Sequence, residues 1–445
     1  MGVSLRSIAL RIARGDRASF VAQATLWIVL GFVLATLLFN GISSALGLAY
    51  PYNSFLFRPD DRFADFFKMC FSYPGAPIHP PSGFWRMDDL LAHHLAEVKE
   101  YEGTNVNHFH QPPIPTLLAL SARWLMGWMD PVLLFLGLLA ASFAALFATV
   151  LTVSPASRAG AAFGLATILS YPALLAIDRG HFFSLICGAL LIAATLRTLR
   201  GGADFWTILM FAIAVNFKPN AGVIPFVLFL GRQGISFRSA MLLAVLSVLL
   251  FVGTLGIVHQ IYPEYTFQRF LRGLAQYGMA YAGGENGFLV GSSFYGMFRT
   301  PLGYSAWMVY PPMILAAAVL APAILEVRDG RLRQSECLFL TLAGYVFGSH
   351  VFADYHLLVF IIPTILLARE EGSLDLSGWT ILIPSSLMLA PKNFIFSVRG
   401  DMAWSWQVVG NPLILLLASL ILIWAAWRRN ALAKDRPAIE APAAA

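Results

Sequence analysis

Ionisable side chains beside apolar runs are the residues of this sequence best suited to chemistry. A charged group close to hydrocarbon is costly, so each one is a functional candidate by default. The candidates form short groups: the Asp60–Asp61 pair with Asp65, the turn of Asp178, Arg179, Gly180 and His181, then Lys218, and finally Asp354, Tyr355 and His356.

A pocket built from carboxylates together with Arg, Lys and His fits one reaction well. A hydroxyl group could attack a sugar that is carried on an anionic lipid phosphate. A carboxylate would take the hydroxyl proton as general base, and cations would stabilise the charge on the departing phosphate. Because phosphate is a good leaving group, one carboxylate suffices. We expect Arg179, Lys218 and His356 to hold the phosphate.

The composition indicates which elements must position these groups. Of the 445 residues, 58% are hydrophobic and only 12% are charged, whereas a soluble protein carries about 25% charged residues. This composition argues against a water-soluble globule. The net charge is +6, but no basic cluster is large enough for nucleic acid, so no nucleic-acid partner is expected. The cysteines at 70, 187 and 337 are too scattered for a disulfide framework or a metal cage.

Apolar runs predict an all-α polytopic membrane protein with about twelve transmembrane helices. About 20 residues cross the ~30 Å hydrocarbon core, and several of the runs are shorter than this. The predicted spans are 20–39, 131–152, 159–177, 181–196, 203–217, 220–230, 239–259, 304–326, 334–348, 355–368, 377–389 and 411–427.

Arginine positions predict the orientation of these spans. Arginines precede the first span, follow the last one and occur in every short loop that would then be cytoplasmic, as the positive-inside rule expects. Lys392 and Arg399 fall in an outer loop against this rule. Two long outer loops result, at 40–129 and 260–303. Within the first, residues 114–129 are expected to lie at the interface rather than to cross.

Four segments resemble a known family. The stretch "RPDDRFADFFKM" at 58–69 is similar to the acidic signature of the lipid-dependent membrane glycosyltransferases of the GT-C superfamily. "NHFHQPPIPTLLAL" at 107–120 resembles the aromatic-Pro-Pro segment before their juxtamembrane helix. Residues 178–220, which begin "DRGHFF" and end "NFKPN", and "ADYHLLVFIIPTIL" at 353–366 look like segments of glycosyltransferase family 87, which includes polyprenyl-phosphomannose-dependent mannosyltransferases.

The resemblance implies a GT-C-like fold over residues 1–437, with juxtamembrane helices in the first outer loop, a plasma-membrane location and an active site that faces the periplasm or exterior. It implies a polyprenyl-phosphate-sugar donor and inversion at the anomeric carbon. By motif position the catalytic base is Asp61 or Asp60, with Asp61 favoured. His356 is the best match for a histidine that touches the donor phosphate, and His350 is second. His181 stands where the family more often has Asn or Gln.

Each candidate also has a structural alternative. Asp60 could cap a helix over 65–71, and Asp65 could pair with Lys68 on that helix. Asp178 and Arg179 could simply pair with each other. Lys218 could reach the headgroups, and His356 could be a packing residue.

Further residues have weaker roles. Glu285, in a Gly-rich loop, is a candidate for contact with substrate. The histidines at 93, 94, 108 and 110 match no zinc pattern, so no cofactor is expected and no divalent metal is required. The tail at 438–445 is rich in Pro and Ala and is expected to be disordered.

The sequence thus predicts an enzyme that moves a sugar from a polyprenyl-phosphate carrier to a lipid or glycan acceptor beside the bilayer, outside the cytoplasm. Two alternatives remain open. One is an O-antigen-type polymerase or ligase that works on pyrophosphate-linked glycans. The other is a transporter or flippase of lipid-linked sugars without chemistry, which would need discontinuous spans in both halves of the chain.

Overall fold

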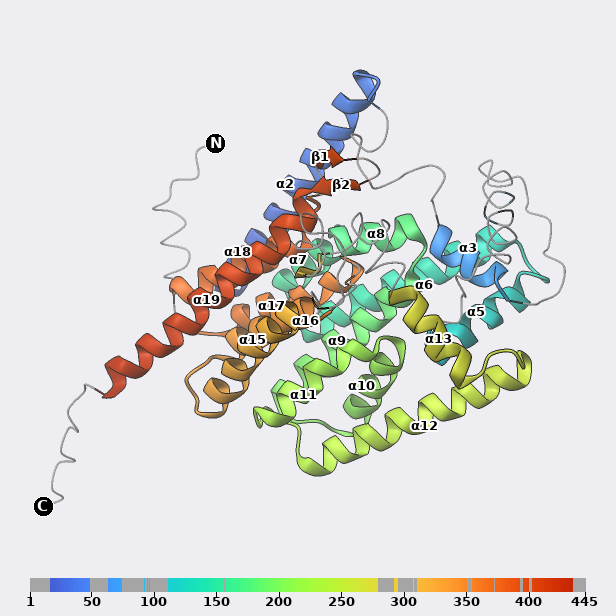
Figure 1. Cartoon of the computed structure of the whole chain (residues 1–445). Helices are drawn as coiled ribbons and strands as arrows, with labels where there is room; N and C mark the ends of the chain where they lie inside the picture. The colour runs from blue at the N-terminus through green and yellow to red at the C-terminus, as the bar shows by residue number, and fades with distance from the viewer. Residues whose placement is uncertain are drawn as a thin grey trace, which may run out of the picture.

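Long apolar runs without internal charges fold into the long helices of the computed structural model (Figure 1). The structure describes residues 17–48, 63–73, 92, 94, 96, 111–155, 157–278, 292–294, 307, 310–349, 352, 354–371, 373–392, 395–399 and 402–434. Within this part, six helices are long and apolar enough to cross a membrane. They are α2 (Arg17–Ala45), α6 (Pro131–Val153), α9 (Phe182–Gly201), α12 (Phe237–Ile261), α15 (Tyr310–Arg328) and α19 (Trp406–Lys434).

A seventh span is possible by length, because α7 (Ser157–Ile168) and α8 (Tyr171–Arg179) form a pair that is bent by 45°. The long helices indicate a membrane protein, whereas the count of twelve stays a prediction. The remaining predicted runs hold shorter elements: α10 (Phe205–Phe217), η4 (Pro219–Gly222) with α11 (Val223–Leu230), α16 (Gln334–Gly348), η8 (Asp354–Phe360) with α17 (Ile361–Arg369), and α18 (Leu376–Leu389).

The shorter elements supply the most deeply buried part of the structure. Nearly every residue of α16 and α17 is buried. In α12, by contrast, only 6% of the most apolar 18-residue stretch is buried. A helix without a strongly polar face is either enclosed by other helices or faces lipid. We therefore read α16 and α17 as the centre of the bundle and α12 as a lipid-facing helix at its edge (Figure 1).

The remaining described elements are small. Helices α3 (Ala64–Phe71) and α5 (Pro113–Leu125) lie in the first predicted outer loop, and α13 (Phe267–Gly278) lies in the second. With 13 residues, α5 is too short to cross at about 1.5 Å per residue, and Trp124 and Trp128 are exposed near its end, as at a membrane interface. The antiparallel strands β1 (Ile395–Arg399) and β2 (Met402–Ser405) pair Val398 with Ala403.

Local sequence explains where several helices begin. Asp130 accepts hydrogen bonds from the backbone N–H groups of Val132 and Leu133 at the start of α6. Asp204 caps α10 and Asp375 caps α18 in the same way. A short polar side chain in this position satisfies N–H groups that have no partner within the helix.

The arginine-rich connections gather at one end of the bundle, which we call the basic end. There Arg17 at the start of α2 pairs with Glu370 after α17, at 3.0 Å. Arg333 pairs with Glu370 at 3.3 Å and with Asp375 at 3.0 Å. Arg369 donates to the carbonyl of Val153 at the end of α6. Connections predicted to be cytoplasmic are therefore together in the structure.

The opposite end, which we call the polar end, carries α3, the α8–α9 turn, the end of α10 and the start of η8. Figure 1 shows α3 and α5 at the right and α8 above the centre, with the α11–α12 and α15–α16 connections toward the lower left. Lys392, which ran against the orientation rule, is buried. Its ammonium group donates to the Leu387 carbonyl and, at 3.1 Å, to the Ala390 carbonyl, so it stabilises the end of α18.

Candidate functional site

The α8–α9 turn is shaped by Gly180. Helix α8 ends there with φ of +72°, and the N–H of His181 donates to the Ala176 carbonyl at 2.7 Å. A Cβ at position 180 would lie 2.9 Å from the Cβ of Phe66 and 3.1 Å from the Cα of Phe63. Only glycine adopts this backbone without cost and leaves this space. The turn therefore packs directly against the start of α3.

Phe63 fixes the entry to α3 onto the same turn. Its N–H donates to the carbonyl of Asp178 at 2.7 Å, and its own φ is +57°. This left-handed conformation costs a non-glycine residue about 1–2 kcal/mol, so the surrounding contacts must hold it. Phe63 is the N-cap residue of α3, and its own side chain makes no capping hydrogen bond. Asp60, the cap that the sequence suggested, lies outside the described residues.

Five polar side chains from distant segments converge beside this turn, and we call them the Asp65 cluster: Asp65, His181, Lys218, Tyr355 and His356. The hydroxyl of Tyr355 donates to a carboxylate oxygen of Asp65 at 3.1 Å. The Tyr355 ring stacks on His181 with centroids 4.6 Å apart. Nδ1 of His181 lies 2.9 Å from the hydroxyl of Ser184. These contacts join α3, the α8–α9 turn and η8.

Lys218 and His356 complete the cluster electrostatically. Lys218 follows α10, and burial lowers the pKa of its ammonium group, an effect that Cys187 and the nearby carboxylate of Asp65 oppose. Lys218 and His181 both act on the imidazole of His356. The neighbouring Asn216 has a structural role: its side-chain amide donates hydrogen bonds to the backbone carbonyls of Ala212 and Ser247.

Arg179 lies next to the cluster in the chain. Its guanidinium lies 3.8 Å from the carboxylate of Asp178, and both side chains are largely buried. The charges of Arg179, Asp178 and Asp354 all act on the buried Tyr171. The structure thus shows the predicted Asp178–Arg179 pair, and it places the arginine at the polar end of the bundle.

Asp354 belongs to a separate buried group. Its carboxylate accepts a hydrogen bond from the hydroxyl of Ser292, which in turn accepts one from the Asn411 amide at 2.8 Å. The pKa of Asp354 is raised to about 7 because the carboxyl group is buried. The hydrogen bond from Ser292 and the positive charge of Lys392 act in the opposite direction and lower this pKa. Burial lowers the pKa of Lys392 to about 7 as well. Asp354 thus ties η8, which carries Tyr355 and His356, to α19.

Sequence reasoning missed Ser292, Lys392, Gln407 and Asn411 as partners of this segment. One signal was present. Gln407 and Asn411 are four residues apart at the start of the last apolar run, and such a spacing places two residues on one face of a helix. Both side chains are buried, and the side-chain amide oxygen Oε1 of Gln407 accepts a hydrogen bond from the backbone N–H of Lys392 at 3.2 Å.

Several predicted residues lie outside the described ranges: Asp60, Asp61, Glu285 and His350. The described histidine of the first outer loop, His94, is fully buried and stacks on Phe67, with centroids 6.5 Å apart. Within the described ranges, no three His, Cys, Asp or Glu side chains gather as they would around a metal ion. Comparison of the chain with protein-family models, curated proteins and solved structures found no match.

Proposed function

We propose that this chain is a membrane glycosyltransferase of the GT-C type. It would transfer a sugar from a polyprenyl-phosphate donor to a lipid or glycan acceptor at the polar end of the bundle, on the exterior side of the plasma membrane. The proposal includes the twelve predicted spans, with α10, the η4–α11 pair, α16, the η8–α17 pair and α18 as the shorter ones.

The Asp65 cluster is the observation that carries this proposal. It combines a carboxylate, a phenol, two imidazoles and an ammonium group, and it draws them from segments as far apart in sequence as Asp65 and Tyr355. Perturbed ionisable groups gathered from distant segments are typical of functional sites. The backbone N–H of Phe63, two residues after Asp61, donates a hydrogen bond to the Asp178 carbonyl. The Asp60–Asp61 pair therefore comes shortly before the cluster in the chain.

The chemistry of transfer divides between the base and the cations. The acceptor hydroxyl attacks the anomeric carbon while Asp61, or Asp60, takes its proton. The bond between the anomeric carbon and the phosphate oxygen breaks, and the electron pair leaves with the lipid phosphate. Lys218, Arg179 and His356 stabilise the added negative charge. Attack opposite to the leaving group inverts the configuration at the anomeric carbon.

The bent α7–α8 pair favours a second candidate, a transporter of lipid-linked sugars. Broken helices frame the substrate sites of many transporters, and the break between Ile168 and Tyr171 bends this pair by 45°. The two functions differ in what happens to the donor, because a transporter leaves the sugar attached to its lipid.

A donor-release experiment separates these candidates. The purified chain in lipid nanodiscs is incubated with polyprenyl-phosphate sugar labelled in the sugar, with and without a mixture of cell-envelope lipid acceptors. We expect label to move to the acceptor and lipid phosphate to be released in equal amount, only when the acceptor is present. Donor that stays intact under all conditions contradicts the enzyme. Transfer from a pyrophosphate-linked donor alone points instead to the polymerase or ligase.

A further inference from the structure

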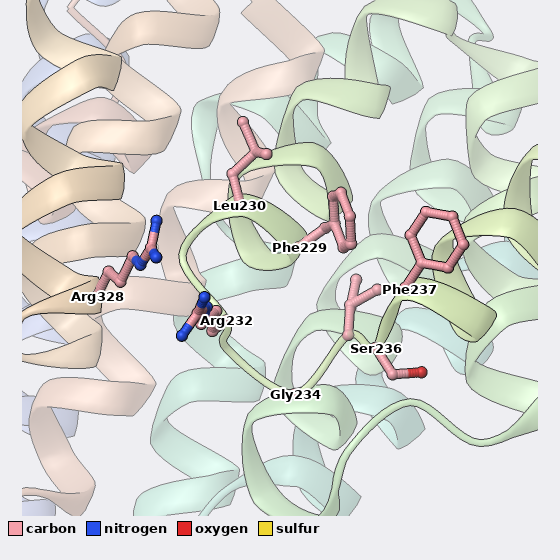
Figure 2. Close-up of a pocket in the computed structure, with 8 residues that line it drawn as sticks. Phe229, Leu230, Arg232, Gly234, Ser236, Phe237 and Arg328 are labelled. Carbon is pink, nitrogen blue, oxygen red and sulfur yellow. The ribbon is translucent and has the colours of Figure 1, made fainter.

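A hollow lies at the basic end of the bundle, at the other end from the Asp65 cluster. It has a volume of about 650 Å³ and opens between the loop after α11, the start of α12 and the end of α15. Its lining residues are Phe229, Leu230, Arg232, Gly234, Ile235, Ser236, Phe237 and Arg328. Figure 2 shows the two arginine side chains toward one side of this hollow and the rings of Phe229 and Phe237 toward the other.

Both arginines present positive charge that the described residues do not neutralise. Arg232 and Arg328 are exposed, and neither makes an ion pair or side-chain hydrogen bond within the described ranges. Nearby cations differ in this respect: Arg331 pairs with Glu326 and Asp329, at 3.2 and 2.9 Å, and Arg197 pairs with Asp204 at 2.9 Å. The hollow is therefore suited to an anion.

The backbone holds Arg232 in place at a cost. Its φ is +56°, which costs a side-chain-bearing residue about 1–2 kcal/mol. The loop is nonetheless fixed on both sides, because the N–H of Gln233 donates to the Leu228 carbonyl at 2.8 Å and the Gly234 carbonyl accepts from the N–H of Ala203 at 2.9 Å. A fixed, strained residue that presents a charge into a hollow is a feature of binding sites.

The start of α12 adds to the positive potential of the hollow. The helix begins at Phe237, and its N-cap residue Ser236 accepts from the N–H of Ser239 at 3.1 Å. Both Ser236 and Phe237 line the hollow. The first turn of a helix carries a partial positive charge and N–H groups without intrahelical partners, so this helix end favours an anion in the same place.

The apolar surroundings distinguish a lipid from a soluble anion. Phe237 is 69% exposed, and Met241, Val245 and Val248 continue an exposed apolar surface along α12. On α15, Leu325 is exposed as well, one turn before Arg328. A phosphate at the arginines would thus sit at the end of two lipid-facing helices, with room for acyl chains along them.

We propose that this hollow, the Arg232–Arg328 site, binds the phosphate headgroup of an anionic phospholipid of the cytoplasmic leaflet. Basic pockets between helices on that side of a membrane recognise such headgroups. Arg232 and Arg328 hold the phosphate oxygens, and the acyl chains lie against α12 and α15. The site is independent of the Asp65 cluster and of sugar transfer.

The test measures binding of a defined lipid to the purified full-length chain in a neutral detergent. Phosphatidylglycerol and, in a separate titration, phosphatidylcholine are added to the protein. The dependence of the thermal unfolding midpoint on lipid concentration gives the apparent affinity for each lipid. Each arginine near a membrane surface contributes about five-fold to binding of an anionic lipid. We therefore expect the Arg232→Gln/Arg328→Gln variant to bind phosphatidylglycerol about 25-fold more weakly, with phosphatidylcholine unchanged.

A matched control removes the same charge elsewhere at the basic end. Arg200 and Arg238 are exposed and do not line the hollow, so Arg200→Gln/Arg238→Gln should keep most of the selectivity. If this control loses as much affinity as the first variant, or if the first variant loses none, the proposal is overturned. The proposal is also overturned if glycerol phosphate raises the thermal unfolding midpoint as much as phosphatidylglycerol does. An Arg232→Lys/Arg328→Lys variant, which keeps both charges, should retain binding and guards against a folding effect.

Discussion

Replacing Asp61 with Asn is expected to lower the rate of sugar transfer by roughly 10²–10⁴-fold, which is the usual contribution of a general base. The amide keeps the size of the side chain but cannot accept the hydroxyl proton. Donor binding should be nearly unchanged, because the side chains proposed to hold the phosphate remain. The measurement is the initial rate of acceptor-dependent release of lipid phosphate, together with the donor concentration at half-maximal rate.

Asp60→Asn and the double variant complete this experiment. If Asp60 is the base, its variant shows the loss and Asp61→Asn does not. Asp329→Asn is a suitable control, since this carboxylate is 47% exposed at the basic end and pairs with Arg331. Folded protein is confirmed for each variant by its elution as a single species. The mechanism fails if the double variant keeps near-wild-type turnover.

The second large effect concerns stability at the basic end. The Glu336 side chain is fully buried, and both of its oxygens accept from a terminal nitrogen of Arg429, at 3.0 and 2.9 Å. It also pairs with Arg333 at 2.9 Å. Glu336 therefore ties α16 to α19, and Arg333 extends the network to Glu370 and Asp375.

Glu336→Gln is expected to destabilise the folded chain by about 2 kcal/mol. Loss of one partner of a buried pair costs about 3–5 kcal/mol, but the two arginines here are 27% and 38% exposed and can turn partly toward water. The thermal unfolding midpoint in detergent should fall, whereas Asp329→Asn, at an exposed ion pair, should leave it almost unchanged. Equal midpoints for the two variants would show that the network contributes little.

Local signals in the sequence predicted the long helices closely. The span expected at 131–152 is α6, Pro131–Val153, because Asp130 and Pro131 mark its start plainly. The break within 159–177 was missed, although Pro172 lies in the first turn of α8 and Ser170 caps that helix. Apolar content alone does not separate one straight helix from two bent ones.

The site was harder to predict than the helices. Asp65, His181, Lys218, Tyr355 and His356 were each recognised as ionisable or polar residues beside apolar runs. Their contacts depend on packing between distant segments. The hydrogen bond between Tyr355 and Asp65 cannot be predicted from the periodicity of a single sequence. The link from Asp354 through Ser292 to Asn411 was missed for the same reason.

The central claim is that the Asp65 cluster faces the exterior and the arginine-rich connections face the cytoplasm. Labelling of single cysteines with a membrane-impermeant maleimide in intact cells tests it, and the native thiols of Cys70, Cys187 and Cys337 are buried and free. Cysteines at the exposed positions Asn220 and Glu264 should be labelled from outside. Cysteines at the exposed positions Asp204 and Asp329 should react only after permeabilisation. Labelling of all four positions from one side, or the reverse pattern, would contradict the account.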